Sequence, residues 1–270
     1  MGLEMKNALK DLAFKLDFVT TTETHPTGSV SVTFTDREDP QYHIEQDVAW
    51  DHITWSDSLE LLAKRADAVC FGSLAQRNPD ARNTIERFLD CTAPHCLRIF
   101  DINLRKPLPE WEILHTSLKK ATILKLNVEE LQYLSERLSL KGNTADHLAA
   151  LLRRFDLSAI ALTRGGQGST LITGDEIAEC SGYTVDVQDT VGAGDAFTAA
   201  LVLGYLRKNP TSEVNATACR VAACVCSQAG AMASLPASVL KEFREHAVPV
   251  REYNPGDPNR ERRRESKTRP

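Results

Sequence analysis

The chain has 270 residues, of which 42% are hydrophobic and 26% are charged, and its formal net charge is −5. These values are typical of a globular protein with one large α/β domain and a substantial buried core. The negative charge gives no attraction for nucleic acid or an anionic membrane, so we expect neither partner. Without a membrane-length apolar stretch or a secretory signal pattern, we expect a cytoplasmic protein.

Cysteine and histidine usage favours neither disulfides nor a metal centre. The seven cysteines are an odd number and include no Cys-x-x-Cys pair. Cys224 and Cys226 lie in an apolar run, so we expect small buried residues in a reducing compartment. The seven histidines are scattered along the chain without metal-ligand spacing.

The first fifty residues predict a small two-stranded sheet. A helix is expected over residues 7–16. Residues 29–34 then alternate polar and apolar side chains, as a half-exposed strand does, and residues 42–44 predict a second strand across a polar turn at 36–39. Two strands alone are marginally stable, so they require another sheet or a partner chain.

From residue 55 onward, short apolar strands alternate with amphipathic helices. The expected strands cover residues 68–71, 97–100, 122–126, 159–163 and 169–173, and the expected helices cover 58–65, 83–89, 129–134 and 145–155. This alternation predicts an α/β fold with a doubly wound, mainly parallel sheet and helices on both faces. Ligands collect at the carboxyl ends of such strands, here residues 72–73, 101–105, 127 and 163–168.

The densest chemical signal is the segment DTVGAGD, residues 189–195, which leads into a small-residue helix bounded by Gly204. A glycine turn before a helix exposes unpaired amides and the positive end of the helix dipole, which together bind phosphate. Asp195 then either reaches a group held over those amides or caps the helix. Neither the dinucleotide fingerprint nor the Walker motif occurs in the chain.

Residues 189–197, DTVGAGDAF, closely resemble the C-terminal signature of the PfkB (ribokinase-like) carbohydrate kinases. Segments similar to those of the family also occur, in the family's order, at residues 26–28, 48–51, 72–77, 101–105, 127–130 and 163–168. The resemblance covers roughly residues 5–245 and is closest to fructokinase-type members. It implies one ribokinase-like domain over residues 1–250, with residues 19–50 forming a β lid. Residues 251–270, rich in Pro, Arg and Glu, are expected to form a disordered tail.

The resemblance implies transfer of the ATP γ-phosphate to a sugar hydroxyl. Asp195 would be the general base, and the amides of Gly192, Ala193 and Gly194 would form the anion hole. The remaining implied roles are ATP binding (Asn127, Thr163, Gly165, Gly168), contact with sugar or phosphate (Gly72, Asp101, Asn103, Arg105), organisation of Mg²⁺ through water (Glu130), and a monovalent cation such as K⁺ at Asp189 with carbonyls near Gln228, Gly230 and Ser234.

Structural alternatives accompany several of these roles. Asn127 with Glu130 also fits a helix N-cap with a first-turn acid. Residues 163–168 also fit a tight turn between two strands. Arg105 could pair with phosphate through its planar fork, although arginines are commonly exposed on the surface.

The chain departs from the family at its start. Family members open with a strand and a Gly-Gly segment that supplies sugar contacts, and both are missing here. We therefore expect an exposed edge on the central sheet and an incomplete sugar-binding half of the site. The leading function is a fructokinase-like sugar kinase. The alternatives are a shortened, catalytically weak or silent nucleotide-binding relative and a nucleoside kinase on the same fold. Unpaired lid edges favour a homodimer.

Overall fold

The computed structural model describes residues 1–34, 40–230 and 233–245. The expected turn at 36–39 and the expected tail at 251–270 lie outside the described residues. Within the described ranges, no helix is long and apolar enough to cross a membrane.

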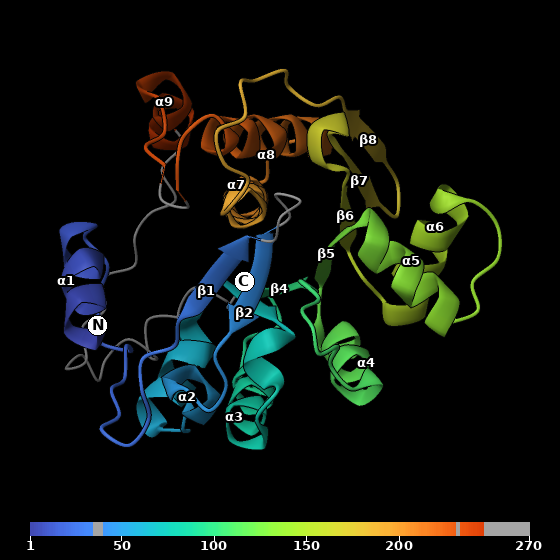
Figure 1. The fold of residues 1–270 in the computed structure, drawn as a ribbon. Helices are drawn as coiled ribbons and strands as arrows, with labels where there is room; N and C mark the ends of the chain where they lie inside the picture. Colours follow the sequence, from blue (N-terminus) through green and yellow to red (C-terminus); the bar gives the residue numbers. More distant parts are fainter. Residues whose placement is uncertain (35–39, 231–232, 246–270) are drawn as a thin grey trace, which may run out of the picture.

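A six-stranded sheet forms the centre of the molecule (Figure 1). Its strands follow the chain order: β3 (Ala68–Gly72), β4 (Leu97–Asp101), β5 (Ile123–Asn127), β6 (Ala159–Thr163), β7 (Ser169–Thr173) and β8 (Ile177–Cys180). The first four pair in parallel, and β7 and β8 continue the sheet as antiparallel strands. The prediction of a mainly parallel α/β sheet is therefore confirmed.

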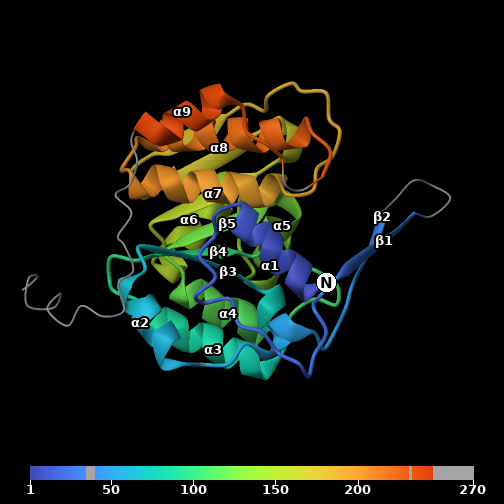
Figure 2. The same ribbon diagram turned by 90° about the vertical axis from the view of Figure 1, so that its left-hand side faces the viewer.

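Nine helices accompany this sheet in the described part of the chain. They are α1 (Gly2–Asp11), α2 (Asp57–Arg65), α3 (Pro79–Asp90), α4 (Trp111–Lys120), α5 (Val128–Arg137), α6 (Thr144–Phe155), α7 (Ala193–Leu206), α8 (Thr211–Cys226) and α9 (Ala237–Glu245). Figure 2 shows α7, α8 and α9 above the sheet, with α3 and α4 below it.

Two apolar cores lie on opposite faces of the sheet. Phe100 and Leu124 pack with helices α4, α5 and α6, whereas their neighbours Ile99 and Ile123 pack with α7 and α8. Successive side chains of a strand point to opposite faces, so each central strand contributes to both cores. Asp101 and Lys125 lie two positions after Ile99 and Ile123, so by this alternation they also face α7.

The N-terminal helix differs from its expected bounds. We predicted a helix over 7–16, and the structure forms α1 at Gly2–Asp11, with no buried residue. Without a buried face, the hydrophobic pattern does not fix where such a helix starts or ends. All seven cysteines are free thiols, as expected, but Cys224 and Cys226 are half-buried rather than buried.

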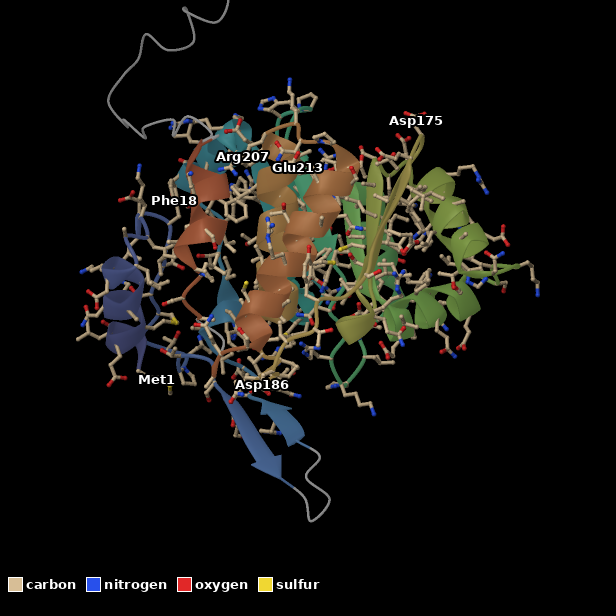
Figure 3. The ribbon with its side chains drawn as sticks, turned by 90° about the horizontal axis from the view of Figure 1, so that it is seen from above. Met1, Phe18, Asp175, Asp186, Arg207 and Glu213 are labelled. Carbon is tan, nitrogen blue, oxygen red and sulfur yellow. The ribbon has the colours of Figure 1, made fainter. Side chains whose placement is uncertain are left out.

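The two early strands form a separate hairpin of β1 (Val30–Phe34) and β2 (Pro40–Ile44), which pair antiparallel. The hairpin projects from the body (Figure 2). Seen from above, it lies at the same end of the molecule as the loop that carries Asp186 and leads into α7 (Figure 3).

Candidate active site

The glycine turn before α7 has the geometry that the sequence predicts. Gly192 is the N-cap with φ 82°, a conformation that side chains other than glycine disfavour. Its carbonyl accepts the Ala196 amide at 2.9 Å, and the Ala193 amide contacts the Thr190 carbonyl at 3.3 Å. The first amides of a helix have no acceptor within it. Asp195 is exposed in this first turn, beside those amides.

Beneath the turn lies an ion pair between neighbouring strands. Asp101 on β4 and Lys125 on β5 are register partners. Lys125 Nζ lies 3.1 Å from Asp101 Oδ1 and 3.0 Å from Oδ2, and the lysine is 8% exposed. Both side chains face α7, so the pair places a buried positive charge under the candidate anion hole.

Helix α7 contacts this pair directly. A Cβ on Gly194 would lie 3.2 Å from Lys125 Nζ. The Thr198 hydroxyl lies 3.2 Å from Asp101 Oδ2 and 3.0 Å from the Gly194 carbonyl. Burial raises the pKa of Asp101, the charge and hydrogen bond of Lys125 oppose that rise, and the nearby charge of Asp195 adds to it.

Lys125 is not among the site residues predicted from the sequence. The available signal was a lysine within the otherwise apolar strand sequence ILKLN of β5. A charged side chain at such a position is buried only with a partner.

Asn127 and Glu130 form a capping box at the start of α5. Asn127 Oδ1 accepts the Glu130 amide, and Glu130 Oε2 accepts the Asn127 amide, both at 2.8 Å. Glu130 Oε1 also accepts the Leu104 amide at 2.8 Å, and burial raises the pKa of this carboxyl. The geometry is therefore that of the N-cap alternative, and Glu130 ties the loop after β4 to α5. Its part in organising Mg²⁺ remains a prediction.

A cavity of about 460 Å³ adjoins the first turn of α7. Its lining includes Thr163, Gly165 and Gly168 from the turn after β6, Ala193 and Gly194 from α7, and Ala222, Ala223 and Cys226 from α8. Three of the four predicted ATP-binding residues thus line one cavity with two of the predicted anion-hole residues. Asn127 does not line it.

Glycines let two backbone segments meet along this cavity. Gly168 has φ 91°, and a Cβ there would lie 2.0 Å from the Cys180 carbonyl oxygen. A Cβ on Gly182 would lie 1.8 Å from the Gly166 carbonyl oxygen. No side chain fits at either contact, so both residues must be glycine for the turn after β6 to pack against the segment after β8.

Asp189 ties the loop before α7 to the segment after α8. Its Oδ1 accepts the Val191 amide at 3.0 Å and its Oδ2 the Gly230 amide at 3.1 Å. These hydrogen bonds hold the pKa of Asp189 below its ordinary value. In the same segment, the Gln228 side chain forms two hydrogen bonds with the Ser234 backbone: it donates to the carbonyl and accepts from the amide. The structure brings the predicted cation-site residues together, and the cation itself remains a prediction.

The predicted sugar-contacting residues lie in three different places. Gly72 and Asn103 line a second cavity of about 200 Å³, together with Trp50. Asp101 lies in the ion pair with Lys125. Arg105 is exposed, with its Nη1 donating to the Leu104 carbonyl at 3.2 Å, and does not line either cavity.

The hairpin is joined to the body by a buried carboxylate. Asp51 is 1% exposed and accepts two hydrogen bonds of 2.7 Å from Arg77, through Nε and Nη2. Burial raises the pKa of Asp51, but its hydrogen bonds to Arg77 and Val48 and the Arg77 charge outweigh that effect and lower it overall. Arg77 also donates to the Glu45 carbonyl, just after β2, at 2.5 Å.

Comparison with known sequences identifies the family. Residues 1–238 match the pfkB family carbohydrate kinases. The chain is 32% identical over 178 residues to the sugar kinase PH1459 of Pyrococcus horikoshii, covering 62% of this chain and 52% of that protein. It is 30% identical over 110 residues to fructokinase of Escherichia coli, covering 39% and 34% respectively. The chain spans about half the length of the curated relatives it matches.

Solved structures show the same fold. The crystal structure of PH1459 superposes with a TM-score of 0.73 at 27% identity, covering 89% of this chain and 77% of that one. Its complex with ATP gives 0.67 at 28% identity, covering 84% and 73%. A fructokinase with bound ATP from Xylella fastidiosa gives 0.74 at 20% identity, covering 90% and 81%. The resemblance in the DTVGAGD segment is confirmed, and the chain belongs to the PfkB family of carbohydrate kinases.

Proposed function

We propose that this protein transfers the γ-phosphate of ATP to a hydroxyl of a small sugar, as fructokinases do. One observation carries the proposal. Ala193 and Gly194 at the start of α7 line the cavity of about 460 Å³, and Asp195 is the next residue along the helix. A nucleotide in the cavity would direct its phosphates toward the helix amides, with the carboxylate beside them.

The cavity suits the nucleotide. Its lining combines small residues such as Ala222 with larger apolar ones such as Val187 and Phe197, which suits a flat base, and a volume of about 460 Å³ lies within the range of small-molecule sites. The ATP complex of PH1459, which shares 28% identity with this chain, supports ATP as the ligand.

The proposed step needs little covalent chemistry from the protein. The sugar oxygen attacks the γ-phosphorus in line, its proton passes to a carboxylate oxygen of Asp195, and the bond to the β–γ bridging oxygen breaks to release ADP. The amides at the start of α7 and the Lys125 charge below them would stabilise the negative charge on the transferring group.

Magnesium would be held mainly by the phosphates and water, as this ion prefers. Glu130 already accepts backbone amides on both carboxylate oxygens, so it fits contact through water and not direct ligation. The ion would supply charge neutralisation for the phosphates.

A second candidate is a protein that binds the nucleotide without phosphorylating a sugar. Two observations favour it. The cavity at Gly72 and Asn103 has only about 200 Å³. Strand β3 is also the outer strand of the central sheet in the described part of the chain, and its Cys70 is exposed.

The first experiment measures ADP release from Mg-ATP with fructose, ribose, 2-keto-3-deoxygluconate or inosine. Sugar-dependent release should fall by ~10² or more in Asp195→Asn, because the general base is lost while the fold is kept. Asp186→Asn, in the exposed loop before α7, is the matched control and should retain activity.

Binding and turnover separate the candidates. ATP binding without turnover for any acceptor would support the second candidate, and inosine-dependent turnover would identify a nucleoside kinase. A folded chain that does not bind ATP would contradict both proposals.

A further inference from the structure

Two histidines and an aspartate meet at the base of the hairpin. His25 precedes β1, Asp47 follows β2, and His52 ends the short 3₁₀ turn Ala49–His52. His52 Nε2 lies 2.7 Å from Asp47 Oδ1, and His25 Nε2 lies 3.8 Å from the same oxygen. One potential ligand atom from each residue lies within 4.8 Å of the other two.

The outer ring nitrogens also have oxygen neighbours. His25 Nδ1 is 3.0 Å from the Thr24 hydroxyl, and His52 Nδ1 is 3.9 Å from Asp80 Oδ2 on α3. Only the Thr24 contact is short enough for a hydrogen bond, and such a bond at one ring nitrogen of a metal-binding histidine orients the other toward the ion. The Nε2 atoms of both histidines face Asp47 Oδ1.

The arrangement contains more than the hydrogen bond between His52 and Asp47. His25 stacks on the His52 ring, with ring centroids 3.6 Å apart, and directs its Nε2 to the same Asp47 oxygen. Asp47 has φ 55°, an uncommon conformation for a residue with a side chain. The histidine side chains are 26% and 21% exposed and Asp47 is 77% exposed, which leaves an entry path for an ion.

We propose that His25, Asp47 and His52 bind a divalent transition-metal ion of the zinc class, with water completing the coordination. Two imidazoles and one carboxylate are a common ligand set for such ions. Ligands about 2.1 Å from a tetrahedral ion lie about 3.4 Å apart, and the observed separations of 2.7 and 3.8 Å fall on either side of that value. Because the rings are stacked, binding requires them to rotate apart about their Cβ–Cγ bonds.

The bound ion would fasten both ends of the hairpin to each other. His25 and Asp47 flank the two strands, and His52 contacts α3 through Asp80. The site is separate from the cavity at α7 and does not depend on the proposed kinase function.

Metal titration of the full chain, stripped with a chelator, tests the proposal. We expect one equivalent of Zn²⁺ to bind and raise the thermal midpoint, and Co²⁺ in its place to show visible d–d absorption. His52→Gln and Asp47→Asn should each weaken binding by at least ~10-fold, the size of loss that outer partners alone produce. His95→Gln is the control, because His95 is a surface histidine with a single carboxylate, Asp67, 3.6 Å away.

Two results would overturn the proposal. One is the absence of binding at ~10⁻⁴ M Zn²⁺, far above the range of structural zinc sites. The other is binding that survives in His52→Gln, with thiolate-to-cobalt charge-transfer absorption that assigns the ion to the cysteines. Should His52→Gln fail to fold, Asp80→Asn keeps all three ligands, and unchanged affinity in both Asp80→Asn and Asp47→Asn would equally refute the site.

Discussion

The nucleotide side of the molecule and the hairpin side are built from different parts. On the nucleotide side, backbone groups form most of the candidate site: the amides at the start of α7 and the glycines at 168 and 182 shape the cavity. On the hairpin side, charged and aromatic side chains hold distant segments together, chiefly Asp51 with Arg77.

This difference determines what each side can tolerate. A site made of backbone depends on residues that carry no side chain, so adding one methyl group is enough to disrupt it. A joint made of side chains depends on matched charges, and removing either member leaves the other buried without a partner. Lys125 combines both features, since it is a buried charge that lies against a backbone turn.

The largest expected effect comes from Lys125→Met. The change leaves the Asp101 carboxylate, whose side chain is 14% exposed, without its cation, and we expect a loss of unfolding free energy of about 3 kcal/mol or more. Because the pKa of Asp101 would then rise further, the loss should grow as the pH increases above the ordinary aspartate range. Chemical denaturation between pH 5 and pH 8 measures it.

The double variant Lys125→Met/Asp101→Asn is the control for that experiment. It removes both charges, so most of the stability should return while phosphoryl transfer remains impaired. Equal destabilisation of the single and double variants at every pH would show that the unpaired Asp101 charge is not the cause of the lost unfolding free energy.

Arg77→Met tests the joint on the hairpin side. It leaves the buried Asp51 carboxylate without its cation and should reduce the unfolding free energy by about 3 kcal/mol. Arg77→Lys should recover only part of this, since lysine lacks the two-pronged donor geometry. Arg105→Met, at an exposed position, should change stability by no more than about 0.5 kcal/mol. An effect of Arg77→Met no larger than that would refute the joint.

Gly168→Ala tests the backbone contact beside the cavity. The new methyl group would lie 2.0 Å from the Cys180 carbonyl oxygen at φ 91°, so we expect a loss of about 2 kcal/mol and weaker ATP binding. Gly174→Ala is the matched control, because a Cβ there meets nothing within 4 Å. Calorimetric ATP titration of both variants checks the prediction, and equal affinities would contradict it.

The smallest effect is a pH dependence of opposite sign for the two aspartates. The pKa of Asp51 is lowered from 3.8, so its stabilisation is present at neutral pH and disappears as the pH falls through its folded pKa. The pKa of Asp101 is raised, so its ionised form destabilises the fold at neutral pH and protonation relieves this as the pH falls. Comparing Asp51→Asn and Asp101→Asn with the parent between pH 3 and pH 7 should show opposite slopes, and parallel curves would contradict the assignment.

Much of the fold could be predicted because it is local. The strand at Ala159–Thr163 has the bounds we expected, since an apolar run before a glycine turn specifies both its length and its end. Helix α8 was not predicted, because its small residues Ala218, Cys219 and Cys224 give little helical contrast between polar and apolar faces. Helix α1 was misplaced because none of its residues is buried, so no core-facing pattern marks its bounds.

The candidate site was predictable where backbone forms it. Gly192 identifies the turn, because its φ of 82° disfavours every residue type that carries a side chain. The roles of Asn127 and Glu130 could not be decided from spacing, since a capping box and a metal site use the same residues, and the structure shows the capping box.

By itself, the sequence determined the family, the strands β3 to β7 and the glycine turn with Asp195, because each depends on neighbouring residues. Only the tertiary structure decided which distant charges meet. Asp101 pairs with Lys125 across two strands, and His25 reaches His52 and Asp47 across a hairpin, although the histidine spacing predicted no metal site. These contacts depend on strand register and loop closure, which link residues that no local pattern connects.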